Sequence, residues 1–302
     1  MSRPLVIGLG ELLWDVFGAT RKAGGAPANV AYHAGQLGMQ GAPASRVGND
    51  EPGQGLLEFL EQRGLSTKLV QRDHQHPTGV VTVSVGDRGQ PSYIIHENSA
   101  WDHLQPTESL LSACGGAEAV CFGTLAQRTP DSRETIHQCL HACGDNTLVV
   151  YDVNLRQMWY ARDWIEKSIA AADVVKLNDE ELVVLAPLLD LPDAKGPTFS
   201  RSLHERGVRV VVITRGAAGC SVYSEGNAVD IASRPVSVVD TVGAGDAFTA
   251  AFITGMLKRW PLPRCGRLAN AVGGLVAARE GAMPDVRAEV AKLVTAAEQE
   301  QM

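Results

Sequence analysis

Short apolar runs with the length of buried β-strands alternate with helix-like segments through most of this chain. The strand-like runs are residues 5–9, 119–125, 147–153, 173–177 and 208–214. The helix-like segments between them include residues 131–143, 164–172 and 179–189. Strands that are apolar on both faces are typical of parallel sheets that helices cover on each side. The pattern therefore predicts an α/β fold with a doubly wound, mostly parallel sheet.

Polar residues stand directly after several of the predicted strands. Gly10-Glu11 follows the first run, Asn154 follows the third, Asn178 follows the fourth and Arg215-Gly216 follows the fifth. Ligands of doubly wound sheets bind outside the carboxyl ends of the strands. We therefore expect the functional site at this edge of the sheet.

The segment Asp-Thr-Val-Gly-Ala-Gly-Asp-Ala-Phe at residues 240–248 indicates the chemistry of that site. Gly243, Ala244 and Gly245 form a turn before an apolar, helix-like run. Backbone N–H groups at the start of a helix, at the positive end of its dipole, bind anions. Asp246 follows at the edge of this anion site, where it could accept the proton of a hydroxyl that is being phosphorylated. The alternative is a tight strand-to-helix turn without chemistry.

A second glycine-rich segment, Gly-Gly-Ala-Pro-Ala-Asn-Val-Ala at residues 24–31, starts another predicted helix. Gly24 and Gly25 let the backbone approach a ligand closely, and Pro27 suits the first turn of a helix. Asn29 would project from that turn with both a hydrogen-bond donor and an acceptor. Taken alone, the segment fits a hinge followed by a helix start equally well.

Together, the two segments resemble the signatures of the ribokinase or phosphofructokinase-B family of carbohydrate kinases, and the chain is most similar to bacterial fructokinases. The resemblance extends over nearly the whole chain. It implies a ribokinase-like fold with an α/β domain of residues 1–11, 24–76 and 101–302. It also implies a small β-sheet lid over the sugar, formed by residues 12–23 and 77–100. Two β-rich runs around the turn Gly-Asp-Arg-Gly-Gln at 86–90 support the lid, because they predict a hairpin.

The resemblance implies a set of sugar-binding residues. Asp15 lies just past the first predicted strand, and a carboxylate can accept hydrogen bonds from neighbouring sugar hydroxyls. Gly25 and Asn29 would bind the sugar beside it. From the lid, Glu97 would contribute hydrogen bonds and Trp101 its ring.

Two arginines have alternative interpretations. Arg156, in Asp-Val-Asn-Leu-Arg at residues 152–156, resembles the arginine with which fructokinases and ketodeoxygluconate kinases hold the transferring phosphoryl group. A planar, permanently charged guanidinium suits that role, and a surface salt bridge is the alternative. Arg46, in Ser-Arg-Val-Gly at residues 45–48, belongs either to the sugar site or to a structural ion pair.

The resemblance also implies how the nucleotide and the metal are held. Asn178 and Glu181 fit a family motif that organises Mg²⁺ and its waters near the phosphates of ATP. Mg²⁺ keeps several waters and needs few protein oxygens. The other implied contacts are Thr214, Arg215, Gly216 and Gly219 in a nucleotide-binding turn, Asn270 beside the adenine, and Asp240 at a monovalent-cation site for K⁺.

These assignments predict an ATP-dependent kinase that phosphorylates a primary hydroxyl of a sugar, with Asp246 as the base. Fructose is favoured by Gly-Glu-Leu-Leu-Trp-Asp at residues 10–15 and by the Asn-x-Arg segment. Ketodeoxygluconate, ribose and nucleoside kinases remain alternatives. A sugar-binding regulator without activity is disfavoured by the intact Asp246, Asn178 and Glu181. A dinucleotide-binding oxidoreductase is disfavoured because Leu13 stands where its fingerprint needs a third glycine.

The composition limits the possible binding partners and the cellular location of the protein. The 302 residues carry a net charge of −7, which argues against nonspecific binding to nucleic acid or anionic membranes. No apolar run approaches the roughly 18 residues of a membrane span, and the start of the sequence lacks the features of a signal peptide. We therefore expect a cytoplasmic enzyme with reduced cysteines. A lid with an exposed sheet face further predicts a homodimer in which two lids pair.

Overall fold

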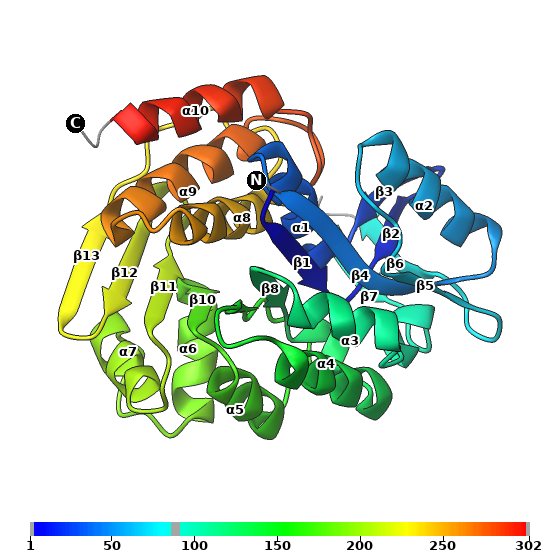
Figure 1. The fold of residues 1–302 in the computed structure, drawn as a ribbon, viewed down its shortest axis with the longest axis horizontal. Helices are drawn as coiled ribbons and strands as arrows, with labels where there is room; N and C mark the ends of the chain where they lie inside the picture. Colours follow the sequence, from blue (N-terminus) through cyan, green and yellow to red (C-terminus); the bar gives the residue numbers. More distant parts are fainter. Residues whose placement is uncertain (1–2, 86–90, 300–302) are drawn as a thin grey trace.

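The structure of the protein, a computed structural model, describes residues 3–85 and 91–299. The predicted turn at 86–90 therefore lies outside the described residues. A nine-stranded sheet runs through the centre of the described part (Figure 1). In spatial order its strands are β13 (Asn227–Ile231), β12 (Cys220–Ser224), β11 (Val210–Thr214), β10 (Val174–Asn178), β9 (Leu148–Asp152), β8 (Ala119–Phe122), β1 (Leu5–Leu9), β4 (Gln40–Gly48) and β5 (Val70–Asp73).

All neighbouring strands of this sheet are parallel except the pairs β11–β12 and β12–β13. Helices cover both of its faces (Figure 1). One face carries α1 (Ala26–Gln36), α8 (Ala244–Leu257) and α9 (Leu262–Ala277), with α10 (Arg287–Gln299) outside them. The other face carries α3 (Glu108–Gly115), α4 (Pro130–Ala142), α5 (Arg162–Ala170), α6 (Asp179–Leu188) and α7 (Gly196–His204). The predicted doubly wound, mostly parallel α/β fold is confirmed.

The strand β1 shows why its sequence is apolar without alternation. Successive side chains of a strand point to opposite faces. Ile7 and Leu9 pack into the core on the α3–α7 side, and Val6 packs into the core on the α1, α8 and α9 side. Because both faces are buried, every position of the strand favours an apolar residue.

A second, four-stranded sheet lies beside the carboxyl ends of the central strands. Its order is β3 (Thr20–Gly24), β2 (Leu13–Phe17), β6 (Gly79–Val85) and β7 (Pro91–Ile95). β2 and β6 are parallel, and the other two pairs are antiparallel. We call this sheet the lid sheet. The helix α2 (Glu51–Gln62) lies next to it, and the indole N–H of Trp14 donates to the Pro52 carbonyl at 2.9 Å.

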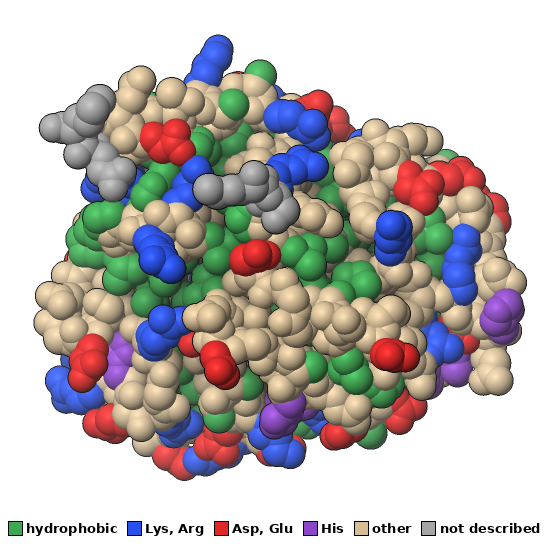
Figure 2. Space-filling model, viewed as in Figure 1, with side chains coloured by type: hydrophobic (Ala, Val, Ile, Leu, Met, Phe, Trp, Pro, Cys, Tyr) green, Lys and Arg blue, Asp and Glu red, His purple; other side chains and the backbone are tan. Residues whose placement is uncertain are grey.

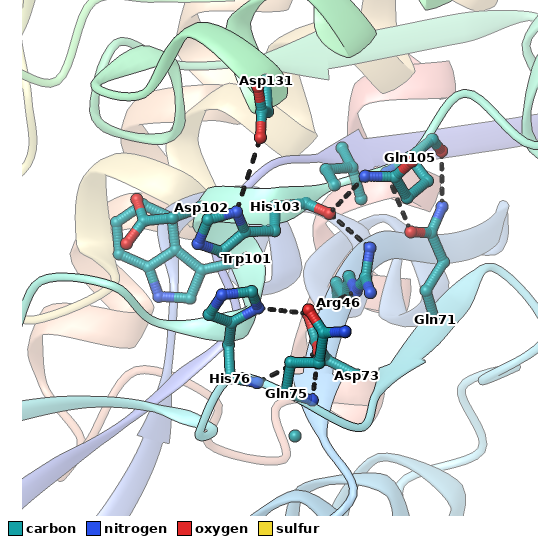
Figure 3. Close-up of polar contacts among 12 residues, drawn as sticks. Arg46, Gln71, Asp73, Gln75, His76, Trp101, Asp102, His103, Gln105 and Asp131 are labelled. Atoms are coloured by element: carbon teal, nitrogen blue, oxygen red, sulfur yellow. Dashed lines mark hydrogen bonds and ion pairs between the residues drawn. The ribbon is translucent and has the colours of Figure 1, made fainter.

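Both chain segments that connect β6 and β7 to the main sheet pass through one polar cluster (Figure 3). The rings of His76 and His103 stack with centroids 3.6 Å apart. Asp73 lies 3.0 Å from His76 Nδ1 and 2.8 Å from Arg46 Nε. Although burial opposes it, hydrogen bonds from Gln75 and His76 lower the pKa of Asp73 to about 2. Arg46 is therefore part of a structural ion pair, the second of its two alternatives.

Acidic and basic side chains are interspersed along the lower edge of the molecule in Figure 2, over helices α4 to α7 of Figure 1. Charges of both signs thus share that surface. Within the described ranges, no helix is both long and apolar enough to cross a membrane.

Candidate active site

A cleft of about 600 Å³ lies between the main sheet and the lid sheet. Its walls include residues at or just past the ends of β1, β9, β10 and β11, the first turns of α1 and α8, and side chains of β2 and β7. The carboxyl ends of the parallel strands therefore form its floor, as the sequence predicts. Of the predicted site residues, those that line the cleft are Asp15, Gly25, Asn29, Arg156, Asn178, Glu181, Thr214, Asp240, Gly243, Gly245 and Asp246.

The predicted anion site lies at the first turn of α8. Gly243 caps the helix with φ of 78°, a left-handed conformation that favours glycine. A Cβ there would lie 2.6 Å from the Ala282 carbonyl oxygen, so only glycine fits. The amide of Ala244 donates to the Thr241 carbonyl at 3.3 Å. The next two amides, of Gly245 and Asp246, have no acceptor among the described residues and are available to a negatively charged group.

The first turn of α1 meets this anion site. Gly25 has φ of 112°, and a Cβ on it would lie 2.3 Å from the Glu11 carbonyl oxygen. This glycine lets the chain turn tightly against the end of β1. One turn into the helix, Asn29 Nδ2 donates to Asp246 Oδ2 at 2.7 Å. The two glycine-rich segments of the sequence thus converge on one carboxylate.

The carboxyl group of Asp246 is tuned toward proton transfer. Burial and the nearby Asp152 raise its pKa to about 6, against the opposing effects of Asn29, Lys176 and Arg156. A carboxylate with a raised pKa is a better proton acceptor, and it remains ionised at neutral pH. Asp246 can therefore act as a general base toward a hydroxyl group in the cleft.

Lys176 is a cleft residue that the sequence reasoning missed. Its Nζ lies 3.0 and 3.1 Å from the two oxygens of Asp152, and Thr249 Oγ1 donates to the same carboxylate at 2.7 Å. Burial lowers the pKa of Lys176, but Asp152, Glu181 and Asp246 raise it more strongly, so the ammonium stays charged. The signal was a single lysine inside the apolar strand Val-Val-Lys-Leu at residues 174–177.

Asp15 and Arg156 approach the cleft from its two sides. Asp15 lies on β2 of the lid sheet, and burial raises its pKa to about 6 although Arg156 opposes the shift. Arg156 lies on an exposed loop between Asn154 and Gln157, whose φ angles of 42° and 51° are left-handed. Backbone strain of this kind occurs at functional sites where the surrounding structure holds it. Gln157 Nε2 donates to the Tyr93 carbonyl at 2.6 Å, which ties this loop to the lid sheet.

Asn178 and Glu181 form a capping box at the start of α6. Asn178 Oδ1 accepts the Glu181 amide at 2.7 Å, and Glu181 accepts the amides of Asn178 and Leu155 at 2.8 Å each. Among the residues that the structure describes, no group of three His, Cys, Asp or Glu side chains could hold a metal alone. The remaining lone pairs of Glu181 fit a hydrated Mg²⁺, which keeps waters and takes phosphate oxygens.

Two predicted lid contacts do not reach the cleft. Trp101 is 1% exposed and packs under Gly79, with the Arg128 guanidinium 4.1 Å from its ring. Its ring is therefore part of the core rather than a cleft wall. Glu97 is exposed and also outside the cleft lining. Their contact with the sugar stays a prediction that this arrangement does not support.

The predicted nucleotide turn is only partly in the cleft. Thr214 lines it, whereas Arg215 pairs with Asp230 at 3.1 Å. Asn270 Nδ2 donates to the Ile231 carbonyl at 3.1 Å and so anchors the end of β13. Asp240 accepts the amides of Val242 and Gly281 at 3.0 Å each, which joins the two loops beside α8. Three other predicted residues lie outside the cleft lining: Gly216, Gly219 and Ala244.

The comparisons with known proteins agree with this geometry. The sequence matches the pfkB family of carbohydrate kinases over residues 7–289. The chain therefore belongs to the pfkB family of carbohydrate kinases, and it is an ATP-dependent sugar kinase. The fructokinase of Vibrio alginolyticus is 30% identical over 272 residues, which cover 86% of this chain and 87% of the relative.

Two further relatives have solved structures. An uncharacterized sugar kinase from Pyrococcus horikoshii is 30% identical over 297 residues, covering 92% of this chain and 91% of the relative. Its structure in complex with ATP matches with a TM-score of 0.78 at 29% identity, over 92% of this chain and 94% of that one. The fructokinase of Vibrio cholerae, solved with fructose, ADP and calcium, matches with a TM-score of 0.81 at 23% identity, over 97% and 99% of the chains.

Proposed function

We propose that this kinase transfers the γ-phosphoryl group of ATP to a primary hydroxyl of fructose. The observation that carries the proposal is the position of Asp246. Its carboxylate is held by Asn29 beside the free amides at the start of α8, in the same cleft as Asp15 and Arg156. A base and an anion site in contact are what transfer to a hydroxyl requires.

In the proposed reaction, the sugar hydroxyl gives its proton to Asp246 as its oxygen bonds to the γ-phosphorus. The bond between that phosphorus and the bridging oxygen of ADP breaks in the same step. The amides of Gly245 and Asp246 hold the charge that develops on the phosphoryl oxygens, and Arg156 adds a positive charge from its loop. Positioning and electrostatic stabilisation of this kind supply most of the catalysis in phosphoryl transfer.

The residues that would hold the cations and the adenine of the nucleotide belong to the same proposal. Glu181 would hold the waters of Mg²⁺, and the metal would neutralise charge on the phosphate oxygens. Asp240 would contribute to a K⁺ site by fixing the loops on either side of it. Thr214, with the turn at Arg215, Gly216 and Gly219, and Asn270 would flank the nucleotide.

The charges in the cleft favour a neutral sugar. Glu11, Asp15 and Asp246 are three acidic groups that line the cleft, and Arg156 lowers the pKa of each. A sugar acid such as ketodeoxygluconate would bring another negative charge close to these carboxyl groups. Hydroxyl groups, in contrast, can donate hydrogen bonds to carboxyl groups.

A coupled assay of ADP release tests the proposal with fructose, ketodeoxygluconate, ribose and adenosine as acceptors. We expect the highest kcat/KM with fructose. A higher value for ketodeoxygluconate would reject the argument from charge, and a higher value for ribose or adenosine would reject fructose as the substrate. No release with any acceptor would favour the sugar-binding regulator.

The lid sheet supports two further proposals. We infer that it closes over bound sugar, because Asp15 and Lys22 from this sheet line the cleft opposite Asp246. We also infer a homodimer through the lid, because its edge strand β7 exposes Tyr93 and Ile94 by 48% and 54%. Sedimentation of a monomer at micromolar concentration would reject the dimer. Because this kinase consumes ATP, we propose that it acts in the cytoplasm.

A further inference from the structure

Glu11 is a buried acidic residue of the cleft to which the proposed reaction assigns no part. It stands two residues past β1 and is 4% exposed. Its Oε1 accepts the amide of Ala26, the first residue of α1, at 3.2 Å. Its Oε2 is buried and has no hydrogen-bond partner among the described residues. The side chain thus presents an unused acceptor in a wall of the cleft.

A purely structural role does not explain why this residue is acidic. A neutral amide or hydroxyl oxygen would accept the Ala26 amide as well. Burial raises the pKa of Glu11 to about 7, and Asp246 adds to the shift. Placing a second carboxyl group near the base is therefore unfavourable in the absence of a partner. Groups perturbed in this way, in a cleft, are candidates for a functional role.

The contacts of α1 place Glu11 close to the reacting group. Glu11 is bonded to Ala26, and Asp246 is bonded to Asn29. Both carboxyl groups are therefore held at the first turn of α1, Glu11 by a backbone amide and Asp246 by the side chain of Asn29. Electrostatic coupling between Glu11 and Asp246 agrees with this closeness.

We propose that Glu11 binds the sugar directly, with Oε2 accepting a hydrogen bond from a hydroxyl other than the one that is phosphorylated. The inference rests on the proposed function, since it adds a contact within the same sugar site. It makes Glu11 a residue that distinguishes among sugars by the hydroxyl they carry at one position.

Binding of singly deoxygenated sugars provides the test. Dissociation constants are measured by titration calorimetry for fructose and its deoxy analogues, with wild type and Glu11→Gln. If the ADP-release screen selects another sugar, the deoxy series of that sugar is used. The glutamine keeps an oxygen for the Ala26 amide and replaces the free oxygen with a donor. Glu118→Gln is a control outside the cleft, because the exposed Glu118 accepts the Leu5 amide at 2.6 Å near the opposite end of β1.

Binding is measured at pH 8, above the Glu11 pKa of about 7. For wild type, we expect one analogue to bind roughly 10- to 100-fold more weakly than the parent sugar, as for a lost hydrogen bond to a charged group. The substitution Glu11→Gln should weaken binding of the parent sugar by a similar factor. The variant should bind that analogue no more weakly than it binds the parent sugar. Its affinity for ATP and its melting temperature should match those of Glu118→Gln.

Either of two results would overturn this inference and leave the proposed function intact. One is unchanged sugar affinity in Glu11→Gln. The other is a loss of affinity by the same factor for the parent sugar and for every deoxy analogue. If the glutamine variant does not fold, Glu11→Asp is measured instead, since its shorter side chain cannot reach both Ala26 and the sugar. Equal affinity of Glu11→Asp and wild type for the sugar would also reject the contact. A wild-type protein that binds and phosphorylates no sugar would instead reject the proposed function with it.

Discussion

The floor of the cleft and the lid sheet are held by different kinds of contact. In the floor, the buried Lys176–Asp152 pair is fixed further by Thr249, and Asn29 holds Asp246. The polar contacts of the lid sheet include the exposed pair Lys22–Glu280, at 2.8 Å, in which the side chains are 38% and 76% exposed, while Leu13, Val81 and Ile95 of this sheet pack into a buried core cluster. Exposed pairs contribute little to stability, whereas breaking a buried pair costs several kcal/mol. Of these ion pairs, the one in the floor is therefore the stronger.

The largest effect is expected when Asp246, the proposed base in the floor of the cleft, is replaced. Asp246→Asn should lower turnover by on the order of 10² to 10⁴, because the amide keeps the size of the side chain and cannot accept the proton. Steady-state kinetics give turnover, and calorimetry should show sugar binding close to that of wild type. A variant that keeps more than half of the wild-type turnover, with chemistry rate-limiting, would show that Asp246 is not the base.

The comparison of floor and lid is sharpened by two matched lysine variants. Lys176→Met should lower the free energy of unfolding by about 3–5 kcal/mol, because it leaves Asp152 buried without its cation. Lys22→Met, which removes the exposed lid pair, should cost at most about 1 kcal/mol. Urea denaturation measures both values. Equal losses would mean that floor and lid are held with similar strength.

Asp15 tests whether the lid sheet contributes to recognition of the sugar. Asp15→Ala should raise the KM for the sugar by roughly 10- to 100-fold, because the hydroxyl groups of the sugar lose a charged partner. The KM for ATP should change little. Initial rates over a grid of both substrates separate the two constants, and equal changes in both would mean that Asp15 is only structural.

Activity should fall at acidic pH as the carboxylate of Asp246 becomes protonated. The pKa of Asp246 is raised to about 6, and only the ionised form accepts a proton. The value of kcat/KM, which follows the free enzyme, should therefore rise with pH up to about 6 and fall about tenfold per unit below it. A pH series of kcat/KM reports this limb, which should be missing from the residual activity of Asp246→Asn. A limb that survives in the variant belongs to another group.

The smallest effect is expected in the lid sheet itself. Fructose should slow amide hydrogen exchange in β6 and β7, because closing is driven by contacts made only in the closed state. Strands β8 and β9 in the floor serve as the internal reference and should change little. Equal protection with and without saturating fructose would reject the closing lid.

The sequence predicts best where a local pattern decides the structure. Residues 5–9 match β1 because every position is apolar and the strand is buried on both faces. β4, at Gln40–Gly48, was not predicted as a strand, since Gly, Ala and Pro make up much of it and β-branched residues are few. It is held by its parallel neighbours β1 and β5, which no local pattern reveals.

The same distinction applies to the site. Asp246 and Asn29 are visible in the sequence because glycines mark the turns that carry them. The arrangement does not support the predicted sugar contact of Trp101, because an aromatic residue after a hairpin suits a lid and a core equally well, and this ring packs under Gly79. Glu11 and Lys176 received no role because their partners lie far along the chain, at Ala26 and Asp152.

The bond between Asn29 and Asp246 also has a consequence for the synthesis of the protein. It joins side chains 217 residues apart in the chain. While a ribosome makes the protein, the segment at residues 24–31 is exposed long before the segment at residues 240–248 is synthesised. With Asp246 as the proposed base, an incomplete nascent chain should not transfer phosphate, and cutting the gene between these two segments should give fragments that are active only when they reassemble.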